Sequence, residues 1–220
     1  MEPKNRLEEL VFKILKESEA LITDTHVVLT SGRHGNAYIN KDAIYVHPEN
    51  VMFLCTQLAQ GFFECPEKAS VVAAPALGGI ILSQMTAFKM TYFELISRPP
   101  MAVYAEKQAD GSFAFRRGYD KLLKGTSVAV VEDILTTGGS VKKTIEAVSA
   151  CGGNVIAVGA LVNRGGITAE DLDVPHLFSL ANVELETWAE EECPLCQQGV
   201  PINTEVGKGA EYLARKAAEK

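Results

Sequence analysis

The sequence lacks the features that mark membrane-spanning, secreted and nucleic-acid-binding proteins. No apolar run approaches the roughly 18 residues that a membrane span requires. The opening stretch, MEPKNRLEEL, has no apolar core of the kind found in signal peptides. Lys and Arg number 21 against 28 Asp and Glu, a net charge of −7, whereas a general nucleic-acid binder usually carries a basic surplus. We therefore expect a soluble, cytoplasmic protein with no membrane or nucleic-acid partner.

Cysteine is also sparse. The five residues (Cys55, Cys65, Cys151, Cys193 and Cys196) are odd in number and scattered, which argues against a secreted disulfide framework. Only Cys193 and Cys196 have the spacing of metal ligands. A structural zinc site requires two further ligands, and no second Cys-x-x-Cys or paired histidine follows them. We therefore interpret the five cysteines as reduced thiols and expect no metal site made of protein ligands.

No repeat, low-complexity segment or domain linker interrupts the chain. Its 220 residues, 47% hydrophobic and 22% charged, suit one globular domain with a small appendage. Long apolar runs at 70–76, 127–135 and 154–162 alternate with segments of helical periodicity. Unbroken apolar strands between helices are typical of a parallel sheet covered on both faces. We expect an α/β fold with a central, mostly parallel sheet flanked by helices.

The predicted elements follow from periodicity and from turn residues. Helices are expected at 6–21, from Pro48, at 81–90, at 141–153 and from about 207 to the end. Short strands at 27–30 and 37–40 flank a polar loop, and further strands are expected at 101–105 and 176–182. The predicted organisation is an N-terminal helix and hood (1–44), a core (45–190), and a C-terminal tail and helix packing on the core (191–220).

The most informative segment is Val128–Ser140, in which an apolar strand ends in two acids and a Thr-Thr-Gly-Gly-Ser loop. Ligands of parallel sheets bind at the carboxyl ends of strands. The glycines allow amide groups to converge on an anion, and the start of the next helix adds its positive dipole end. Glu132 and Asp133 cannot bind that anion directly, but they can accept hydrogen bonds from hydroxyl groups. Together these groups predict a sugar-phosphate site.

Other interpretations of this segment fit less well. It has no Gly-Lys-Ser/Thr ending of a P-loop, and the chain has no Gly-x-Gly-x-x-Gly dinucleotide motif. A strand followed by an ordinary capped helix would explain one hydroxyl group. It would not explain two adjacent carboxylates followed by the Thr-Thr-Gly-Gly-Ser loop.

This pattern resembles the signature with which type I phosphoribosyltransferases bind 5-phosphoribosyl 1-diphosphate (PRPP). The hood segment Leu29–Asn40 is similar to that of the orotate phosphoribosyltransferases, which form one branch of that family. Ala105-Glu106-Lys107, with Arg116 and Arg117, resembles their flexible catalytic loop, and Cys193–Cys196 with Gly199–Pro201 resembles their C-terminal part in bacteria. The resemblance covers residues of about 20 to 202.

The resemblance implies a site residue by residue. The implied PRPP site consists of Glu132, Asp133, Ile134, Leu135, Thr136, Thr137, Gly138, Gly139, Ser140, Leu77, Gly78, Gly79, Arg116 and Arg117. Within it the two acids hold the ribose hydroxyls, residues 136–140 hold the 5′-phosphate, and residues 77–79 hold pyrophosphate. The implied orotate site consists of Thr136, Arg164, Ser31, Gly32 and Tyr38, and the catalytic residues are Lys107 and Asp133.

Several of these residues also have plain structural interpretations. Arg164 could be a surface arginine at the end of a strand, Tyr38 a core residue, and residues 77–79 a simple turn. The segment around Asp110 and Gly111 also fits a β-hairpin. The chain departs from the family pattern at Thr30 and Leu77, where a lysine can occur, and its catalytic loop contains no histidine.

The implied reaction joins orotate to the ribosyl group of PRPP, releasing pyrophosphate and forming orotidine 5′-monophosphate for pyrimidine biosynthesis. The implied cofactor is Mg²⁺, held mainly by PRPP, and the implied assembly is a homodimer whose loop acts in trans. Two alternatives keep the PRPP signature: a purine phosphoribosyltransferase and a non-catalytic PRPP-sensing regulator. A fused pyrimidine enzyme is disfavoured, because a decarboxylase barrel needs roughly 200 more residues.

Overall fold

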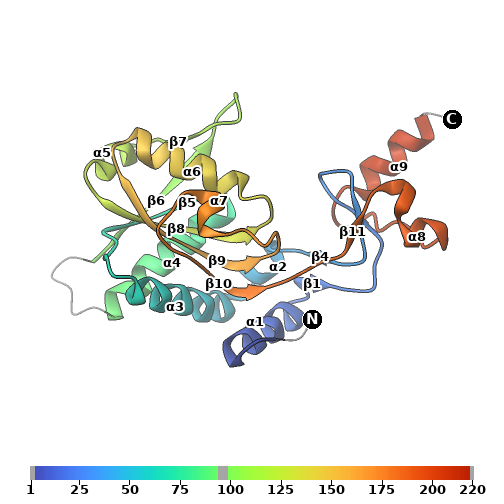
Figure 1. Cartoon of the computed structure of the whole chain (residues 1–220), viewed down its shortest axis with the longest axis horizontal. Helices are drawn as coiled ribbons and strands as arrows, with labels where there is room; N and C mark the ends of the chain where they lie inside the picture. The colour runs from blue at the N-terminus through green and yellow to red at the C-terminus, as the bar shows by residue number, and fades with distance from the viewer. Residues whose placement is uncertain (1–2, 94–98, 219–220) are drawn as a thin grey trace. The chain divides into compact units, whose positions relative to one another are not determined.

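The computed structural model describes residues 3–93 and 99–218 (Figure 1). By their contacts the residues form two units, each described by itself below. The core unit contains residues 1–11 and 47–183, and the hood unit contains residues 12–46 and 184–220. The hood unit thus combines two parts of the chain that the sequence analysis assigned separately, to the N-terminal hood and to the C-terminal tail. No helix among the described residues is long and apolar enough to span a membrane.

The core unit is built on a six-stranded sheet. Its strands are β5 (Val71–Pro75), β6 (Met101–Lys107), β7 (Phe113–Phe115), β8 (Ser127–Leu135), β9 (Asn154–Asn163) and β10 (Leu177–Asn182). Their order is β10-β9-β8-β5-β6-β7, and every neighbouring pair is parallel except β6 with β7. Every residue of β5 and nearly every residue of β8 and β9 is buried, because helices cover both faces. The predicted mostly parallel sheet is confirmed.

Helices lie on both faces of this sheet (Figure 1). On one side, α3 (Pro48–Glu64) and α4 (Gly78–Phe93) pack against each other and against the strands. On the other side, α6 (Gly139–Ala150) packs over β5, β8 and β9. There its buried Val141 and Val148 join the Val128 and Val130 side chains in one apolar cluster. The short helices α5 (Tyr119–Leu123) and α7 (Ala169–Leu172) complete the unit.

The hood unit consists of small sheets and short helices. Strand β1 (Leu21–Ile22) pairs with β4 (Tyr38–Ile39), and β3 (His34–Gly35) lies between β2 (Val27–Val28) and β11 (Thr187–Trp188). The helical elements of this unit are α2 (Asp42–Tyr45), the 3₁₀ turn η1 (Glu190–Glu192), α8 (Pro194–Gln197) and α9 (Gly209–Ala218). Helix α1 (Arg6–Glu17) includes residues assigned to both units.

Two local predictions were wrong. The first helix ends at Glu17, not at residue 21, because Leu21 and Ile22 pair with β4 instead. His34 and Gly35, expected in a polar loop, form the middle strand of a sheet. One of its partners, β11, lies about 150 residues away in the chain, so no local pattern could indicate this pairing.

Candidate active site

The order of the strands predicts where a ligand binds in the core unit. From β5 the chain continues to β6 on one side, whereas β8, β9 and β10 lie on the other side. The helices that follow β5 and β8, α4 and α6, cover opposite faces of the sheet (Figure 1). Such a switch point opens a crevice at the carboxyl ends of the two strands. The two loops predicted to bind pyrophosphate and phosphate leave from these strand ends.

The loop after β8 has the geometry expected of an anion cradle. Gly138 adopts a left-handed conformation (φ = +72°) immediately before α6, which is costly for any residue with a side chain. Thr136 and Thr137 precede it, and Gly139 and Ser140 begin a 12-residue helix. Amide groups in the first turn of a helix have no acceptor within that helix and lie at its positive dipole end. The arrangement suits a phosphate group.

Glu132 and Asp133 lie near the end of β8 and are 6% and 3% exposed. Glu132 Oε1 accepts a hydrogen bond from the Asp133 amide (3.1 Å), and Asp133 Oδ1 accepts one from the Ile134 amide (2.8 Å). The pairing of β8 with β5 ends at Val130, so both acids lie beyond that ladder on the β5 side. Consecutive side chains of a strand point to opposite faces of the sheet. A single ligand can therefore contact both acids only at the edge of β8 that faces β5, where β8 is no longer paired with β5. Ile134 and Leu135 complete the strand beside β9.

The structure brings the chain at Arg164 against the phosphate loop. Strand β9 ends at Asn163, opposite Leu135 of β8, and the Arg164 and Gly165 amides both donate to the Leu135 carbonyl (2.8 and 3.0 Å). A Cβ atom at Gly165 would lie 1.5 Å from the Thr136 carbonyl oxygen. Only glycine permits this contact, so Gly165 sets the approach of Arg164 to Thr136. Gly165 was not predicted as a site residue, because the requirement for glycine arises from a neighbouring strand.

The predicted pyrophosphate loop joins β5 to α4. The Ala76–Leu77 peptide bond is cis, and the Leu77 side chain is 83% exposed. Gly78 and Gly79 begin the 16-residue helix α4. A Cβ atom at Gly79 would lie 2.6 Å from the Ala74 Cβ, so a glycine allows α4 to start close against β5.

The predicted catalytic loop is a β-hairpin in the structure, the alternative that its sequence left open. Lys107 is exposed at the end of β6, two residues beyond Ala105, which pairs with Pro75 of β5. Arg117 forms an ion pair with Glu106 (Nε–Oε1, 3.0 Å), and Arg116 donates to Gln108 (2.6 Å).

The contacts of Arg116 with Gln108 and of Arg117 with Glu106 join the two arms of the hairpin. Lys143 of α6 donates to the Gly111 carbonyl at the tip (2.6 Å), so the tip contacts a helix of its own chain.

The other predicted orotate-binding residues belong to the hood unit. Ser31 and Gly32 occupy a tight turn in which Gly32 has φ = +79° and donates to the Leu29 carbonyl (2.9 Å). Tyr38 is half-buried in β4, and its ring lies near Gly207. The other two predicted orotate-binding residues, Thr136 and Arg164, belong to the core unit.

Comparisons with known proteins identify the family of the chain. A family model described as "Phosphoribosyl transferase domain" matches residues 41–191. The orotate phosphoribosyltransferase of Caldicellulosiruptor bescii is 37% identical over 190 residues, which cover 86% of this chain and 92% of that protein.

Solved structures share the fold. The orotate phosphoribosyltransferase of Aeropyrum pernix is 25% identical, with a TM-score of 0.57 over 78% of this chain and 93% of its own. The Mycobacterium tuberculosis enzyme in complex with PRPP is 22% identical, with a TM-score of 0.58 over 80% of this chain and 95% of its own. With a glycine-rich loop and two buried acids at the switch point, and with relatives matched over nearly their whole length, the chain belongs to the orotate phosphoribosyltransferase family.

Proposed function

We propose that the chain transfers the phosphoribosyl group of PRPP to orotate, giving orotidine 5′-monophosphate and pyrophosphate in pyrimidine biosynthesis. The observation that carries the proposal is the end of β8, where two buried carboxylates lie two residues before a glycine-rich loop and a helix N-terminus. This arrangement offers acceptors for ribose hydroxyls beside donors for a phosphate. The 37% identity to a named orotate phosphoribosyltransferase supports orotate as the base.

In this proposal, each group of predicted site residues contacts a different part of PRPP or orotate. Glu132 and Asp133 accept from the ribose hydroxyls, residues 136–140 donate to the 5′-phosphate, and residues 77–79 contact the pyrophosphate. Arg164 pairs with the carboxylate of orotate, since a guanidinium can donate to a carboxylate through two parallel hydrogen bonds. By the family resemblance, Ser31, Gly32 and Tyr38 are further proposed orotate contacts.

Catalysis in this proposal is electrostatic. As the bond between the ribosyl carbon C1 and pyrophosphate breaks, positive charge grows on the sugar ring and negative charge on the leaving group. Asp133 stabilises the first, and Lys107, assisted by Arg116 and Arg117, stabilises the second. For both arginines this requires giving up the hairpin contacts to Gln108 and Glu106. No covalent enzyme intermediate is needed, and exclusion of water protects PRPP from hydrolysis.

The proposed cofactor is Mg²⁺, held mainly by oxygens of PRPP. Magnesium prefers oxygen ligands and commonly binds through substrate phosphates with one or two carboxylates. Glu132 and Asp133 fit this preference, because they place carboxylate oxygens beside the proposed ribose position. When bound, the ion would neutralise charge on the departing pyrophosphate.

We further propose a homodimer in which the Lys107 hairpin of one subunit serves the site of the other. Its support is the family resemblance and the exposed position of Lys107 at the carboxyl edge of the sheet. Reaching a neighbouring site requires the tip to leave its contact with Lys143. The cytoplasmic location expected from composition stays a prediction.

One assay tests the activity. The purified protein is incubated with PRPP and Mg²⁺ and with orotate, uracil, adenine, hypoxanthine or xanthine in turn, and the nucleotide product is identified by mass spectrometry. We expect product from orotate alone. Turnover of a purine would assign the chain to the purine enzymes, and PRPP binding without turnover of any base would indicate a regulator.

A further inference from the structure

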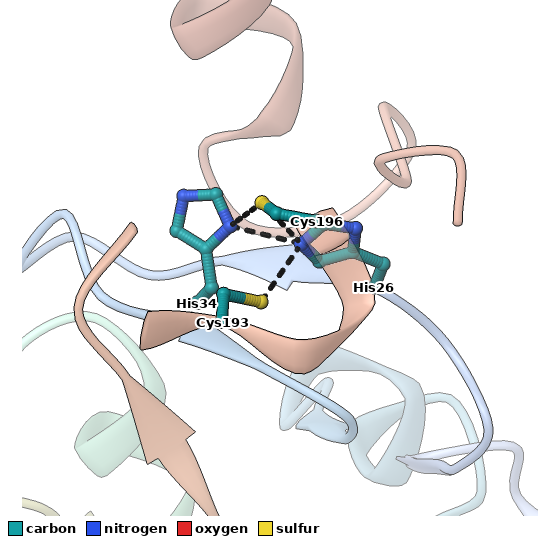
Figure 2. A group of neighbouring side chains, drawn as sticks. All are labelled: His26, His34, Cys193 and Cys196. Carbon is teal, nitrogen blue, oxygen red and sulfur yellow. Dashed lines mark hydrogen bonds between the residues drawn. The ribbon is translucent and has the colours of Figure 1, made fainter. Parts of the chain in front are cut away.

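Two histidines and two cysteines meet in the hood unit, and none of the four is assigned to the reaction. His26, His34, Cys193 and Cys196 each offer one ligand atom, and the four atoms lie within 4.8 Å of one another. Figure 2 shows the four side chains converging, the histidines from the segment around β2 and β3 and the cysteines from the segment at α8. We propose that these four residues bind a structural Zn²⁺ ion.

Three of the six distances between the ligand atoms match the edges of a zinc tetrahedron. Zinc bonds of about 2.0–2.1 Å to nitrogen and 2.3 Å to sulfur place N and S ligand atoms about 3.6 Å apart. The Cys193 and Cys196 sulfurs lie 3.6 and 3.7 Å from His26 Nε2, and the Cys196 sulfur lies 3.4 Å from His34 Nδ1. The two histidine nitrogens are 2.8 Å apart, and admitting an ion would widen this distance by about 0.5 Å.

His26 is oriented as a metal ligand. Its Nδ1 is 2.8 Å from the Val200 carbonyl oxygen, which can only accept, so Nδ1 carries the proton. In a neutral ring the lone pair of Nε2 therefore points into the cluster. Histidines bound to a metal usually donate their other N–H group to a carbonyl or carboxylate in this way. His34 uses the opposite nitrogen, and its buried Nε2 has no hydrogen-bond partner in the described part of the chain.

The ligand set favours zinc in a closed, structural site. Four protein ligands of the Cys₂His₂ type leave no position for a substrate. Zinc would displace the two thiol protons into solvent, and two thiolates would then balance the charge of the ion. Burial supports the same conclusion, since His26, His34 and Cys193 are at most 1% exposed.

The hood unit has a physical need for such a cross-link. It contains about 70 residues in two distant segments, with strands of only two residues. Small units rarely bury enough apolar surface to hold themselves together, and metal sites commonly compensate. The proposed ion would join residues 26–34 to residues 193–196, which are about 160 positions apart. Plain thiols were expected because no further metal ligands follow the two cysteines, whereas both histidines precede them by about 160 residues.

The test is the metal content of the full-length protein. Wild-type protein purified under reducing conditions is stripped with a chelator, reloaded with Zn²⁺ and freed of excess metal, and zinc is measured by mass spectrometry. We expect one zinc per chain and a rise in the thermal midpoint on reloading. Loading with Co²⁺ should give the visible absorption of a tetrahedral ion and a thiolate charge-transfer band. Stoichiometric zinc or cobalt with these properties supports the proposal.

Matched variants locate the ion. Cys196→Ser and His34→Gln should lose the stoichiometric metal, whereas Cys151→Ser and exposed His176→Gln, outside the cluster, should keep it. If a cluster variant fails to fold, the metal stoichiometry and the cobalt spectrum of the wild-type protein still decide whether the proposed site exists. No bound metal in reduced wild-type protein, a Cys193–Cys196 disulfide in its place, or metal lost equally from the control variants would overturn the proposal.

Discussion

At the scale of single residues, Arg164 carries the proposed choice of base. Replacing it with Ala removes a charge-assisted hydrogen-bonding partner, usually worth about 1.5–3 kcal/mol. We expect kcat/KM for orotate to fall roughly 10- to 150-fold, with PRPP affinity much less affected. Steady-state kinetics with each substrate varied in turn measure both effects. An equal loss for both substrates would show that Arg164 is structural.

Glu132 and Asp133 carry the proposed contact with ribose. The double substitution Glu132→Gln and Asp133→Asn keeps their shape and removes both charges. We expect a higher KM for PRPP and slower turnover, because hydrogen bonds from hydroxyls to charged acceptors are the stronger ones. Circular dichroism serves as the control for folding, and each single variant shows whether one acid dominates. Near-normal kinetics in a folded double variant would refute the ribose assignment.

At the scale of elements, the packing of the β9 end against the β8 end positions Arg164. A methyl group at Gly165 would collide with the Thr136 carbonyl, so Gly165→Ala must displace one of the two loops. We expect a loss of about 1–3 kcal/mol in the free energy of unfolding, as for other overpacked sites. Both substrates should bind more weakly, because Thr136 belongs to the proposed phosphate loop and Arg164 to the proposed base site.

Gly166→Ala is the matched control for this prediction. A methyl group there meets open space, although the left-handed backbone (φ = +63°) adds a cost of about 1–2 kcal/mol. Urea denaturation measures the loss of stability in each variant. Kinetics should show the larger loss of substrate binding in Gly165→Ala. Equal kinetic effects of the two variants would contradict the packing argument.

Glu8 links α1 to β10 within the core unit. Its carboxylate accepts from the Asn182 amide (2.7 Å) and the Lys4 amide (2.6 Å), and it is 3% exposed. Burial raises the pKa of Glu8, but these hydrogen bonds outweigh it, so the pKa is lower than usual.

A lowered pKa in the folded state stabilises the protein above the ordinary Glu value of about 4.3. We expect Glu8→Gln to lose about 1–2 kcal/mol of unfolding free energy near neutral pH. The difference from wild type should begin to shrink as the pH falls below about 4.3, where the unfolded state binds a proton, and should vanish below the lowered pKa of folded Glu8. Urea denaturation between about pH 3 and about pH 7, a range that brackets the ordinary Glu pKa, measures this difference in unfolding free energy. A difference independent of pH would rule out the charge as its cause.

At the scale of the whole molecule, the proposed dimer predicts complementation between inactive subunits. Lys107→Ala should lower the rate by about 10²–10³, as expected for loss of an electrostatic contact to the leaving group. When it is mixed with Arg164→Ala and subunits exchange, roughly half the dimers are mixed. In each mixed dimer, one site has an intact Arg164 and receives an intact Lys107. Activity should recover to roughly one quarter of wild type under this two-fold model.

The alternative is that the hairpin, whose tip contacts Lys143 of its own chain, serves the site of that same chain. If native mass spectrometry confirms subunit exchange and no activity returns, Lys107 serves the site of its own chain. The hairpin would then keep the position seen here, with its tip against α6.

Much of the core unit was predictable from local sequence. The apolar runs 127–135 and 154–162 coincide with β8 and β9 to within one residue, because strands buried on both faces carry an unbroken hydrophobic pattern. The turn after β8 was predictable for a similar reason, because the glycines and hydroxyl residues at 136–140 form a local motif that joins a strand to a helix. Pro48 marked the start of α3, since proline at the first helical turn costs no hydrogen bond.

Tertiary structure decided what local sequence could not. The strand at His34 exists because β2 and β11 supply its hydrogen bonds, and Gly165 is required because the Thr136 backbone lies against it. The approach of His26 and His34 to Cys193 and Cys196 depends on the chain returning after about 160 residues. A short motif encodes the conformation of its own backbone. Contacts between distant segments depend on the packing of the whole chain, which no local pattern records.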